Sequence, residues 1–274
     1  MANIEKVGLP PERVLYDDGG HQCLLLEDYG HGQMIQSNVY MIIDNNKGIL
    51  LDPGGHKLFK PLFSDISQLI GIANLEYIFL SHQDPDIVAG INGWLMTTNA
   101  IAVISKWWVR FIPHYGLDRY VVDRLKPLED EGGILKLGNS ELFIIPGHFM
   151  HSPGHFQIYD PVSKILFSDD MFFSFGMDYL IVDNPDQLEE HIKKYMEPYV
   201  KRFMGGQRIF KPYAKMLREI DEVFGIDIIA PQHGAIIKGH DNVMKVIEWM
   251  ENLQAGPDII GPVFQIPQKR LKFD

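Results

Sequence analysis

Short apolar runs and longer amphipathic stretches follow one another along most of this chain. Apolar runs at 38–44 and 48–52 enclose the polar residues 45–47 and predict a β-hairpin. Residues 59–70 have the spacing of a helix, and the β-branched and aromatic run 77–80 predicts a buried strand. The later elements follow by the same reasoning: helices over 86–96, 186–204, 212–224 and 242–253, strands over 101–104 and 226–230, and hairpins over 134–145 and 156–167.

The mixture of strands and helices predicts an α/β protein. We find no internal repeat, low-complexity segment or convincing linker, so one domain is expected over residues 1–274. Glycine and proline interrupt residues 256–274, which predicts a C-terminal tail along the surface or along a partner.

Composition narrows the class of protein. The chain has 274 residues, of which 46% are hydrophobic, enough for a generous core. No apolar stretch is long enough to span a membrane and the first residues do not form a signal peptide, so a cytoplasmic protein without a membrane partner is expected. The single cysteine, Cys23, excludes a disulfide framework and a cysteine-rich metal site. A net charge of -11 argues against nucleic acid as the main partner.

Three potential ligands directly follow the predicted strand at 77–80. His82, Asp84 and Asp86 alternate along the chain, so in an extended segment their side chains leave the backbone on the same side. The carboxyl ends of strands are where α/β folds keep their chemistry. The alternative is that Asp84 only caps a helix that starts near Pro85. This stretch alone leaves both interpretations open.

Three further loops carry histidine or aspartate where a predicted strand ends. They contain His148, His151 and His155 after one hairpin, Asp169 and Asp170 after the next, and His233 after the strand at 226–230. One histidine at the end of an apolar strand is more often a structural or surface residue. Four such endings in one chain favour a metal centre that is held by nitrogen and oxygen atoms.

The order of these loops resembles the metallo-β-lactamase superfamily. Within it, the chain is most similar to the lactamase-like domain of the flavodiiron proteins, and above all to the stand-alone oxygen-binding diiron proteins (ODP) related to that domain. The resemblance covers residues 38–237. It implies an αββα sandwich, in which two mixed sheets are flanked by helices.

The resemblance also implies a ligand set for two metal ions. Matched position by position, the set is His82, Asp84, Asp86, His151, Asp170 and His233, with Asp170 as the bridge. His148 is the nearest competitor of His151, and Asp169 that of Asp170, although alternation along a strand lets only one of the two aspartates face the metals. His148 and His155 either orient the ligands or are ordinary loop residues. Asp52 resembles a residue that supports the first loop without binding metal.

Two positions depart from the family pattern. The second carboxylate is usually glutamate and is the shorter Asp84 here, and the histidine that normally follows Asp86 is replaced by Ile87, which cannot bind metal. The first metal would then have four protein ligands, but the second only Asp86, Asp170 and His233. Open positions suit dioxygen or nitric oxide and predict weaker retention of the second metal. The anionic oxygen ligands favour two iron ions, with manganese or zinc as alternatives.

The resemblance implies a non-haem diiron protein that binds dioxygen and senses or carries it in signalling such as chemotaxis. Flavodiiron proteins carry a flavodoxin-like domain whose FMN feeds electrons to the irons; we find no phosphate-binding loop after the last helix and expect neither that domain nor FMN. Two alternatives stay open: an oxygen or nitric oxide reductase component with a separate electron-donor protein, and a metal-dependent hydrolase. Oxygen binding is favoured over turnover. A homodimer is expected from the resemblance alone.

Overall fold

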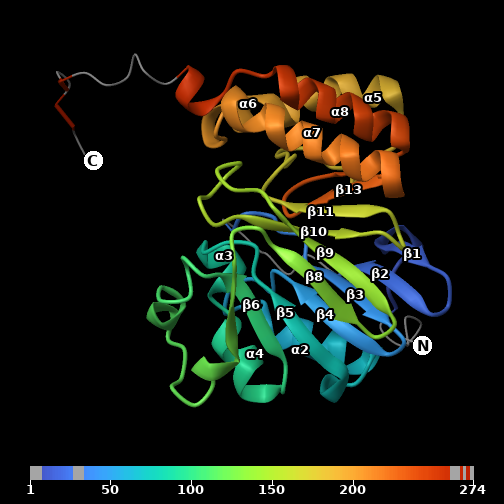
Figure 1. Ribbon diagram of the computed structural model, residues 1–274, viewed down its shortest axis with the longest axis vertical. Helices are drawn as coiled ribbons and strands as arrows, with labels where there is room; N and C mark the ends of the chain where they lie inside the picture. Colours follow the sequence, from blue (N-terminus) through green and yellow to red (C-terminus); the bar gives the residue numbers. More distant parts are fainter. Residues whose placement is uncertain (1–7, 27–33, 260–265, 268–269, 272–274) are drawn as a thin grey trace.

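Two mixed β-sheets face each other at the centre of the molecule (Figure 1). The computed structural model describes residues 8–26, 34–259, 266–267 and 270–271. The first sheet contains, in spatial order, β1 (Val14–Asp17), β2 (His21–Leu25), β3 (Tyr40–Asp44), β4 (Lys47–Leu51), β5 (Leu75–Phe79), β6 (Ile101–Ser105) and β7 (Leu125–Leu128). The second contains β12 (Ile181–Val182), β14 (Ile236–Lys238), β13 (Ile228–Pro231), β11 (Ile165–Asp169), β10 (Phe156–Asp160), β9 (Ser140–Pro146) and β8 (Gly133–Leu137).

Helices cover the outer face of each sheet, which gives four layers (Figure 1). The first sheet is covered by α2 (Phe59–Leu69), α3 (Pro85–Val88) and α4 (Ile91–Thr97), and the second by α5 (Pro185–His191), α6 (Glu197–Phe203), α7 (Gln207–Phe224) and α8 (His240–Asn252). Short helical segments connect these elements: η1 (Pro11–Arg13), η2 (Ile72–Asn74), η3 (Ile112–Tyr115), η4 (Val122–Arg124), η5 (Ile192–Met196) and η6 (Gly256–Asp258). The αββα architecture is confirmed. Within the described residues, no helix combines the length and apolar character needed to cross a membrane.

Side-chain alternation distributes the apolar residues of each strand between two layers. In β3, Met41 and Ile43 pack toward the helices of the first sheet, whereas Tyr40 and Ile42 lie between the two sheets. Three apolar clusters result, one under each helical layer and one between the sheets. The central cluster holds the two sheets in register and fixes how their loops meet.

The loops that carry the predicted ligands meet at one edge of this sandwich. In the first sheet β4, β5 and β6 run parallel, and in the second β11 and β13 do, so the carboxyl ends of these strands lie side by side. Several hydrogen bonds join the sheets there. Phe156 N donates to Ser81 O over 3.0 Å, and Asn38 Nδ2 donates to Pro231 O over 2.9 Å. Residues far apart in the sequence are thereby brought to one place.

The predicted hairpins are confirmed, and their turns have the expected chemistry. Asn45 and Asn46 join β3 to β4 with φ values of 47° and 65°. Gly138 has a φ of 57° in the turn between β8 and β9. Two-residue turns between strands need this left-handed conformation, which asparagine and glycine adopt most readily.

The helix predicted over 86–96 is wrong in one respect, because it is divided into α3 and α4. Gly90 N donates to Gly54 O over 2.9 Å, and a Cβ at Gly90 would stand 2.8 Å from that oxygen. The close approach of the neighbouring loop therefore ends one helix before the other begins.

Three other predictions need correction. The helix expected from residue 212 begins at Gln207, because the stripe formed by Phe210, Ala214 and Leu217 is buried and its packing outweighs the hydrogen bond lost at Pro212. The helix predicted over 186–204 consists of α5, the π-helix η5 and α6. The strands β1, β2, β7, β12 and β14 were not predicted. Of the tail predicted over 256–274, only η6 is a described element, and most of the rest lies outside the described residues.

Candidate metal centre

The structure brings all six predicted ligands together at the edge where the loops meet. They come from the segment after β5 (His82, Asp84, Asp86), the loop between β9 and β10 (His151), the residue after β11 (Asp170) and the loop after β13 (His233). Both sheets therefore contribute ligand atoms. Each of these side chains has a nitrogen or oxygen atom within 3.5 Å of another member.

The carboxylate of Asp170 lies between two groups of side chains. Its Oδ2 atom is 3.5 Å from His82 Nε2 and 3.3 Å from His151 Nε2. Its Oδ1 atom is 3.1 Å from His233 Nε2. One carboxylate thus presents a separate oxygen to each of two sets of nitrogen atoms, which is the arrangement of a ligand shared by two metal ions.

The two groups differ in size. In the first, Asp84 Oδ2 is 3.4 Å from His82 Nε2 and 3.2 Å from His151 Nε2, and with Asp170 the ligand atoms of the four residues lie within 4.8 Å of one another. In the second, Asp86 Oδ2 is 3.3 Å from His233 Nε2, and Asp170 is the other member. The first position therefore offers more protein donors than the second.

The backbone conformation of Asp84 matches the capping interpretation, but its side chain does not. Asp84 occupies the N-cap position of α3 and makes no side-chain capping hydrogen bond. Its carboxylate faces His151 and His82 instead, and their hydrogen bonds hold its pKa well below the usual range. The geometry favours the ligand interpretation.

Lone pairs in this site face one another. His82 Nδ1 donates to Asp169 Oδ2 over 2.8 Å, so Nε2 carries the lone pair of the ring. This buried Nε2 atom has no hydrogen-bond partner and points toward the oxygens of Asp84 and Asp170. Acceptors at such distances repel unless a cation lies between them, so the donor set fits a bound metal ion.

His233 repeats this arrangement at the second position. Its Nδ1 atom donates to the carbonyl oxygen of Gln36, which leaves Nε2 to face Asp170 and Asp86. Burial alone would lower the pKa of His233, but hydrogen bonds to Asp170 and Asp86 raise it to about 10. Without metal a proton fills the place of the cation, and metal binding must therefore release protons.

Two aspartates support the first ligand loop from behind. Asp169 turns away from the ligand group and accepts from the far nitrogen of His82, as alternation predicts for the neighbour of Asp170. Asp52 Oδ1 accepts from Ser81 N over 2.8 Å and from Ser81 Oγ over 2.9 Å, which agrees with the supporting role expected for it. Asp52 directly follows β4, and Asp169 is the last residue of β11. Their φ values of 49° and 51° place both residues in the left-handed region.

The two histidines that flank His151 have different environments. His155 is fully buried, and its Nε2 atom is 2.8 Å from Asp169 Oδ2. His148 Nε2 donates to the carbonyl oxygen of Asp130 over 2.8 Å, away from the ligand group. His155 is therefore connected to the ligands through Asp169, whereas His148 is a loop residue.

Ile87 lies where the resemblance would place a further ligand. It is fully buried in the apolar cluster under the first helical layer. No donor atom replaces the missing histidine at this position in α3. The second group of ligands is consequently the smaller one.

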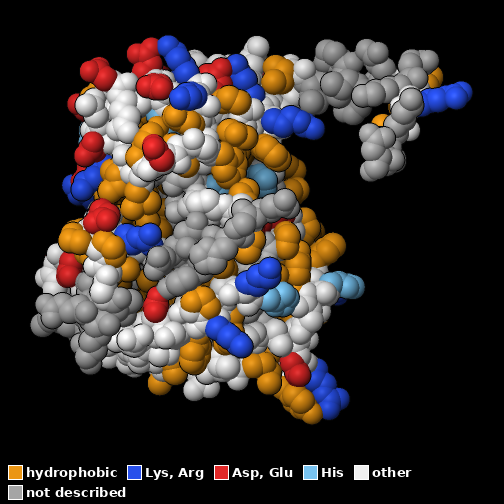
Figure 2. All heavy atoms as spheres, turned by 180° about the vertical axis from the view of Figure 1, so that it is seen from behind, with side chains coloured by type: hydrophobic (Ala, Val, Ile, Leu, Met, Phe, Trp, Pro, Cys, Tyr) orange, Lys and Arg blue, Asp and Glu red, His pale blue; other side chains and the backbone are white. Residues whose placement is uncertain are grey.

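A cavity of about 400 Å³ opens onto five of the six residues, Asp84, Asp86, His151, Asp170 and His233, whereas His82 is fully buried behind them. Its remaining wall is apolar: Ile35, Pro85, Phe173, Phe175 and Phe203. The ring of Phe175 packs 5.4 Å from the ring of His233. Figure 2 shows histidine side chains recessed among hydrophobic ones on this face. The cavity gives small apolar molecules access to the centre.

Sequence reasoning missed several residues of the site. The Gln36 carbonyl fixes His233 through the backbone, which no side-chain pattern reveals. The cavity wall formed by Phe173, Phe175 and Phe203 comes from one segment after Asp170 and from the end of α6. The aromatic run directly behind Asp170 was a usable signal for part of this wall.

The fold and the site define a metallo-β-lactamase-type protein with a candidate two-metal centre. Residues 35–234 match the family described as ODP family beta lactamase, and the chain belongs to this family.

Two solved structures of the chemotaxis sensor ODP are similar to this chain. One contains a peroxy diiron species, with 36% identity, a TM-score of 0.79, and coverage of 92% of this chain and 99% of that chain. The other is the apo state from T. denticola, with 36% identity, a TM-score of 0.78, and coverage of 92% and 98%.

Curated relatives are more distant and longer. An uncharacterized protein of Methanocaldococcus jannaschii is 27% identical, over 82% of this chain and 56% of its own length. The anaerobic nitric oxide reductase flavorubredoxin of Klebsiella pneumoniae is 24% identical, over 79% of this chain and 45% of its own length. The chain thus spans about half the length of the curated relatives it matches.

Proposed function

We propose that this chain is a non-haem diiron protein that binds dioxygen and acts as an oxygen sensor in signalling such as chemotaxis. The observation that carries the proposal is the carboxylate of Asp170, whose two oxygens face separate groups of imidazole nitrogens. The first iron would be held by His82, Asp84, His151 and Asp170, and the second by Asp86, Asp170 and His233. A ferrous pair supplies the electrons that dioxygen takes up.

The protein contributes orientation and shielding. Asp169 and the Gln36 carbonyl fix the rings of His82 and His233, so that each directs one lone pair into the centre. Phe173 and Phe175 line the cavity and disfavour bulk water. The second position has fewer protein donors and would leave room for a diatomic ligand.

The relatives support the sensing part of the proposal. The solved structures described above are named as a chemotaxis sensor and as its peroxy diiron species, and they share 36% of their residues with this chain over 92% of its length. We therefore expect a signalling protein as the partner that reads the oxygen state.

Anaerobic loading with ferrous iron tests the proposal. We expect the protein to bind two irons per chain. On addition of oxygen it should form a long-lived coloured species at one dioxygen per iron pair, with little consumption of an electron donor. Protein that takes up neither iron nor another divalent metal would overturn it.

A second candidate is an oxygen or nitric oxide reductase component that receives electrons from a separate donor protein. It is favoured by the flavorubredoxin relative, which is named as a nitric oxide reductase. Rapid and continuing oxidation of the donor in the same experiment would support it over the sensor. Zinc retention without any response to oxygen would instead support a metal-dependent hydrolase. Metal analysis of the purified protein would distinguish iron from manganese.

We further propose that the protein is a cytoplasmic homodimer. Trp107, Phe149 and Phe203 are each 56% exposed, and large aromatic side chains are enriched at interfaces. Solution scattering at several concentrations measures the mass, and a monomeric mass throughout would contradict the dimer.

A further inference from the structure

Two histidines contact the same oxygen of Asp169, and only one of them is a proposed ligand. Asp169 Oδ2 accepts from His82 Nδ1 over 2.8 Å. The Nε2 atom of His155 lies 2.8 Å from this oxygen as well, yet neither ring nitrogen of His155 has an aligned hydrogen bond. His155 is fully buried.

Packing holds the ring of His155 in this place. A Cβ at Gly147 would stand only 3.2 Å from His155 Nδ1, and Gly147 N donates to the carbonyl oxygen of His155 over 2.9 Å. The ring of His82 lies edge-on to it with the ring centres 5.7 Å apart. The ring is therefore held close to Asp169 by its neighbours.

The short distance identifies the nitrogen that carries the proton. A lone pair on Nε2 would repel a carboxylate oxygen at 2.8 Å, whereas an N–H group is attracted at that distance. His155 thus holds a polar N–H beside the oxygen that accepts from His82, although not in the alignment of a full hydrogen bond. Part of the negative charge of Asp169 is engaged by His155 and is withdrawn from the bond to His82.

We propose that His155 is a positioning residue that weakens the hydrogen bond between Asp169 and His82 and thereby limits electron donation from His82 to the first metal. A carboxylate that accepts strongly from a metal-bound histidine makes that ligand more basic. A more basic ligand stabilises oxidised iron and lowers the reduction potential. The inference rests on the proposed diiron centre.

The direct test uses zinc-loaded protein, because zinc is diamagnetic and the Nδ1 proton of His82 is then observable by NMR. His155→Phe keeps a planar ring but removes the N–H group, and we expect the His82 proton resonance to move downfield. His155→Gln retains a side-chain N–H and should return the resonance toward its original position. His148→Phe is the matched control, because His148 belongs to the same loop and bonds to Asp130 instead.

The iron-loaded protein provides a second readout. His155→Phe should lower the reduction potential by an amount that changes the oxidation equilibrium tenfold, about 59 mV for a one-electron step. Asp169→Asn removes the charge that polarises His82 and should move the potential in the opposite direction.

Either of two results would overturn the inference and make His155 a packing residue only. One is an unmoved His82 resonance in zinc-loaded His155→Phe. The other is a reduction potential of His155→Phe that moves in the same direction as that of Asp169→Asn. If the parent protein binds neither zinc nor iron, the proposed function fails with it. Normal metal uptake with an unmoved resonance refutes only the role of His155.

Discussion

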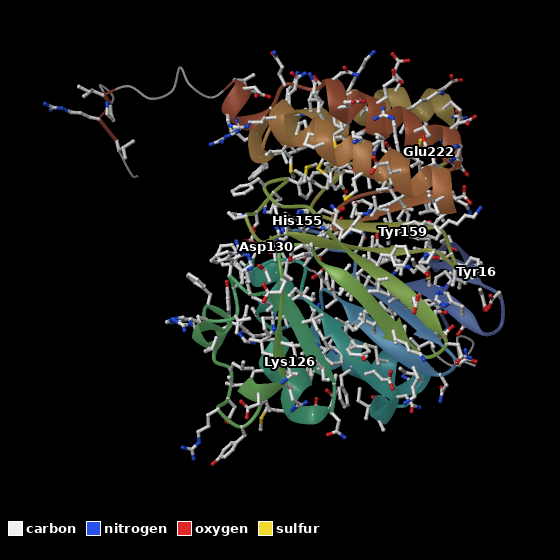
Figure 3. All side chains as sticks on the ribbon, viewed as in Figure 1. Tyr16, Lys126, Asp130, His155, Tyr159 and Glu222 are labelled. Carbon is white, nitrogen blue, oxygen red and sulfur yellow. The ribbon has the colours of Figure 1, made fainter. Side chains whose placement is uncertain are left out.

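The molecule contains two buried clusters of histidine and aspartate, one at each end of the strands. The candidate metal centre lies where β10 begins, and the cluster around His21 lies where β10 ends at Asp160. In Figure 3, His155 lies close to the first cluster and Tyr16, whose ring is 5.9 Å from that of His21, lies close to the second. The same side-chain types therefore occur in two places with different chemistry.

The His21 cluster is closed, in the sense that both ring nitrogens of His21 already have a protein partner. His21 Nε2 is 2.8 Å from Asp160 Oδ2, and His21 Nδ1 is 3.1 Å from Asp44 Oδ1. Cys23 Sγ donates to the same oxygen of Asp160 over 3.3 Å, and Ser140 Oγ donates to Asp44 over 2.7 Å. Both nitrogens of the ring have a carboxylate partner, so a protonated His21 satisfies the cluster without a metal ion.

The metal centre differs in which atoms are left without a partner. His82 uses Nδ1 for Asp169, and its remaining nitrogen faces oxygens of Asp84 and Asp170 at 3.4 and 3.5 Å without a hydrogen-bond partner. The two clusters share side-chain types but not burial, because Asp84, Asp86 and His151 of the metal centre are partly exposed whereas the His21 cluster is buried. The direction of donors and acceptors decides which of them requires a cation.

Asp170→Ala tests the comparison with the largest expected effect. Because Asp170 supplies an oxygen to both groups, its removal should abolish binding of both metal ions. Metal analysis after ferrous loading measures the loss. His21→Leu is the control and should retain both metals. Unchanged metal content in Asp170→Ala would mean that the ligand assignment is wrong.

His21→Leu should instead reduce stability. It leaves the carboxylates of Asp44 and Asp160 buried without their shared partner, and breaking a buried ion pair typically costs about 3 kcal/mol of unfolding free energy. Urea unfolding of the metal-free protein measures the change. His240→Ala, which removes an exposed partner of Asp221, should cost less than about 1 kcal/mol. Equal effects in the two variants would contradict a closed cluster.

The contribution of His21 to stability should depend on pH. Burial favours neutral His21, but Asp160 and Asp44 raise its pKa, so its contribution is full below about pH 6.5 and is lost as pH rises through the raised pKa. Burial would raise the pKa of Asp44, but hydrogen bonds from Asn45 and Asn139 lower it to about 2. The contribution of Asp44 is therefore present above about pH 3.9 and is lost toward pH 2.

The difference in unfolding free energy between the parent and His21→Leu should consequently be largest between about pH 4 and pH 6.5. Urea unfolding at a series of pH values measures it. A difference that grows above pH 7 would show that His21 is neutral in the folded protein.

Ile87→His should have the smallest effect. An added imidazole next to Asp86 is expected to tighten the second metal position. Because Ile87 is packed in an apolar cluster, the imidazole should also cost the metal-free protein about 1–3 kcal/mol. Competition with a chelator measures retention of the second metal, and Ile87→Asn separates ligation from the burial of a polar group. Retention equal in both variants would argue against a ligand role.

Sequence patterns predicted the elements that depend on local periodicity. The hairpins at Asn45 and Gly138 and the ligand loops after the strands follow from turn chemistry and from where apolar runs end. The division of the helix at Gly90 depends on a distant loop and has no local signal. Tertiary packing also placed the start of α7 before Pro212.

The positions of the six candidate ligands were predictable from the sequence, but the contacts that orient them were not. A period of two separates Asp169 from Asp170 but does not say which histidine Asp169 contacts. His21 looked ordinary because its partners stand 23 and 139 residues away. The two clusters differ in the partners of their imidazole nitrogens, and these partners are distant in the sequence.

The left-handed backbone at Asp52 and Asp169 restricts which mutations can accumulate there. Residues with a Cβ rarely adopt this conformation, and asparagine, aspartate and glycine tolerate it best. Genetic drift at the two positions should therefore favour these three residue types. The restriction arises from chain geometry, so it should persist even in descendants of this gene that have lost their metal ligands.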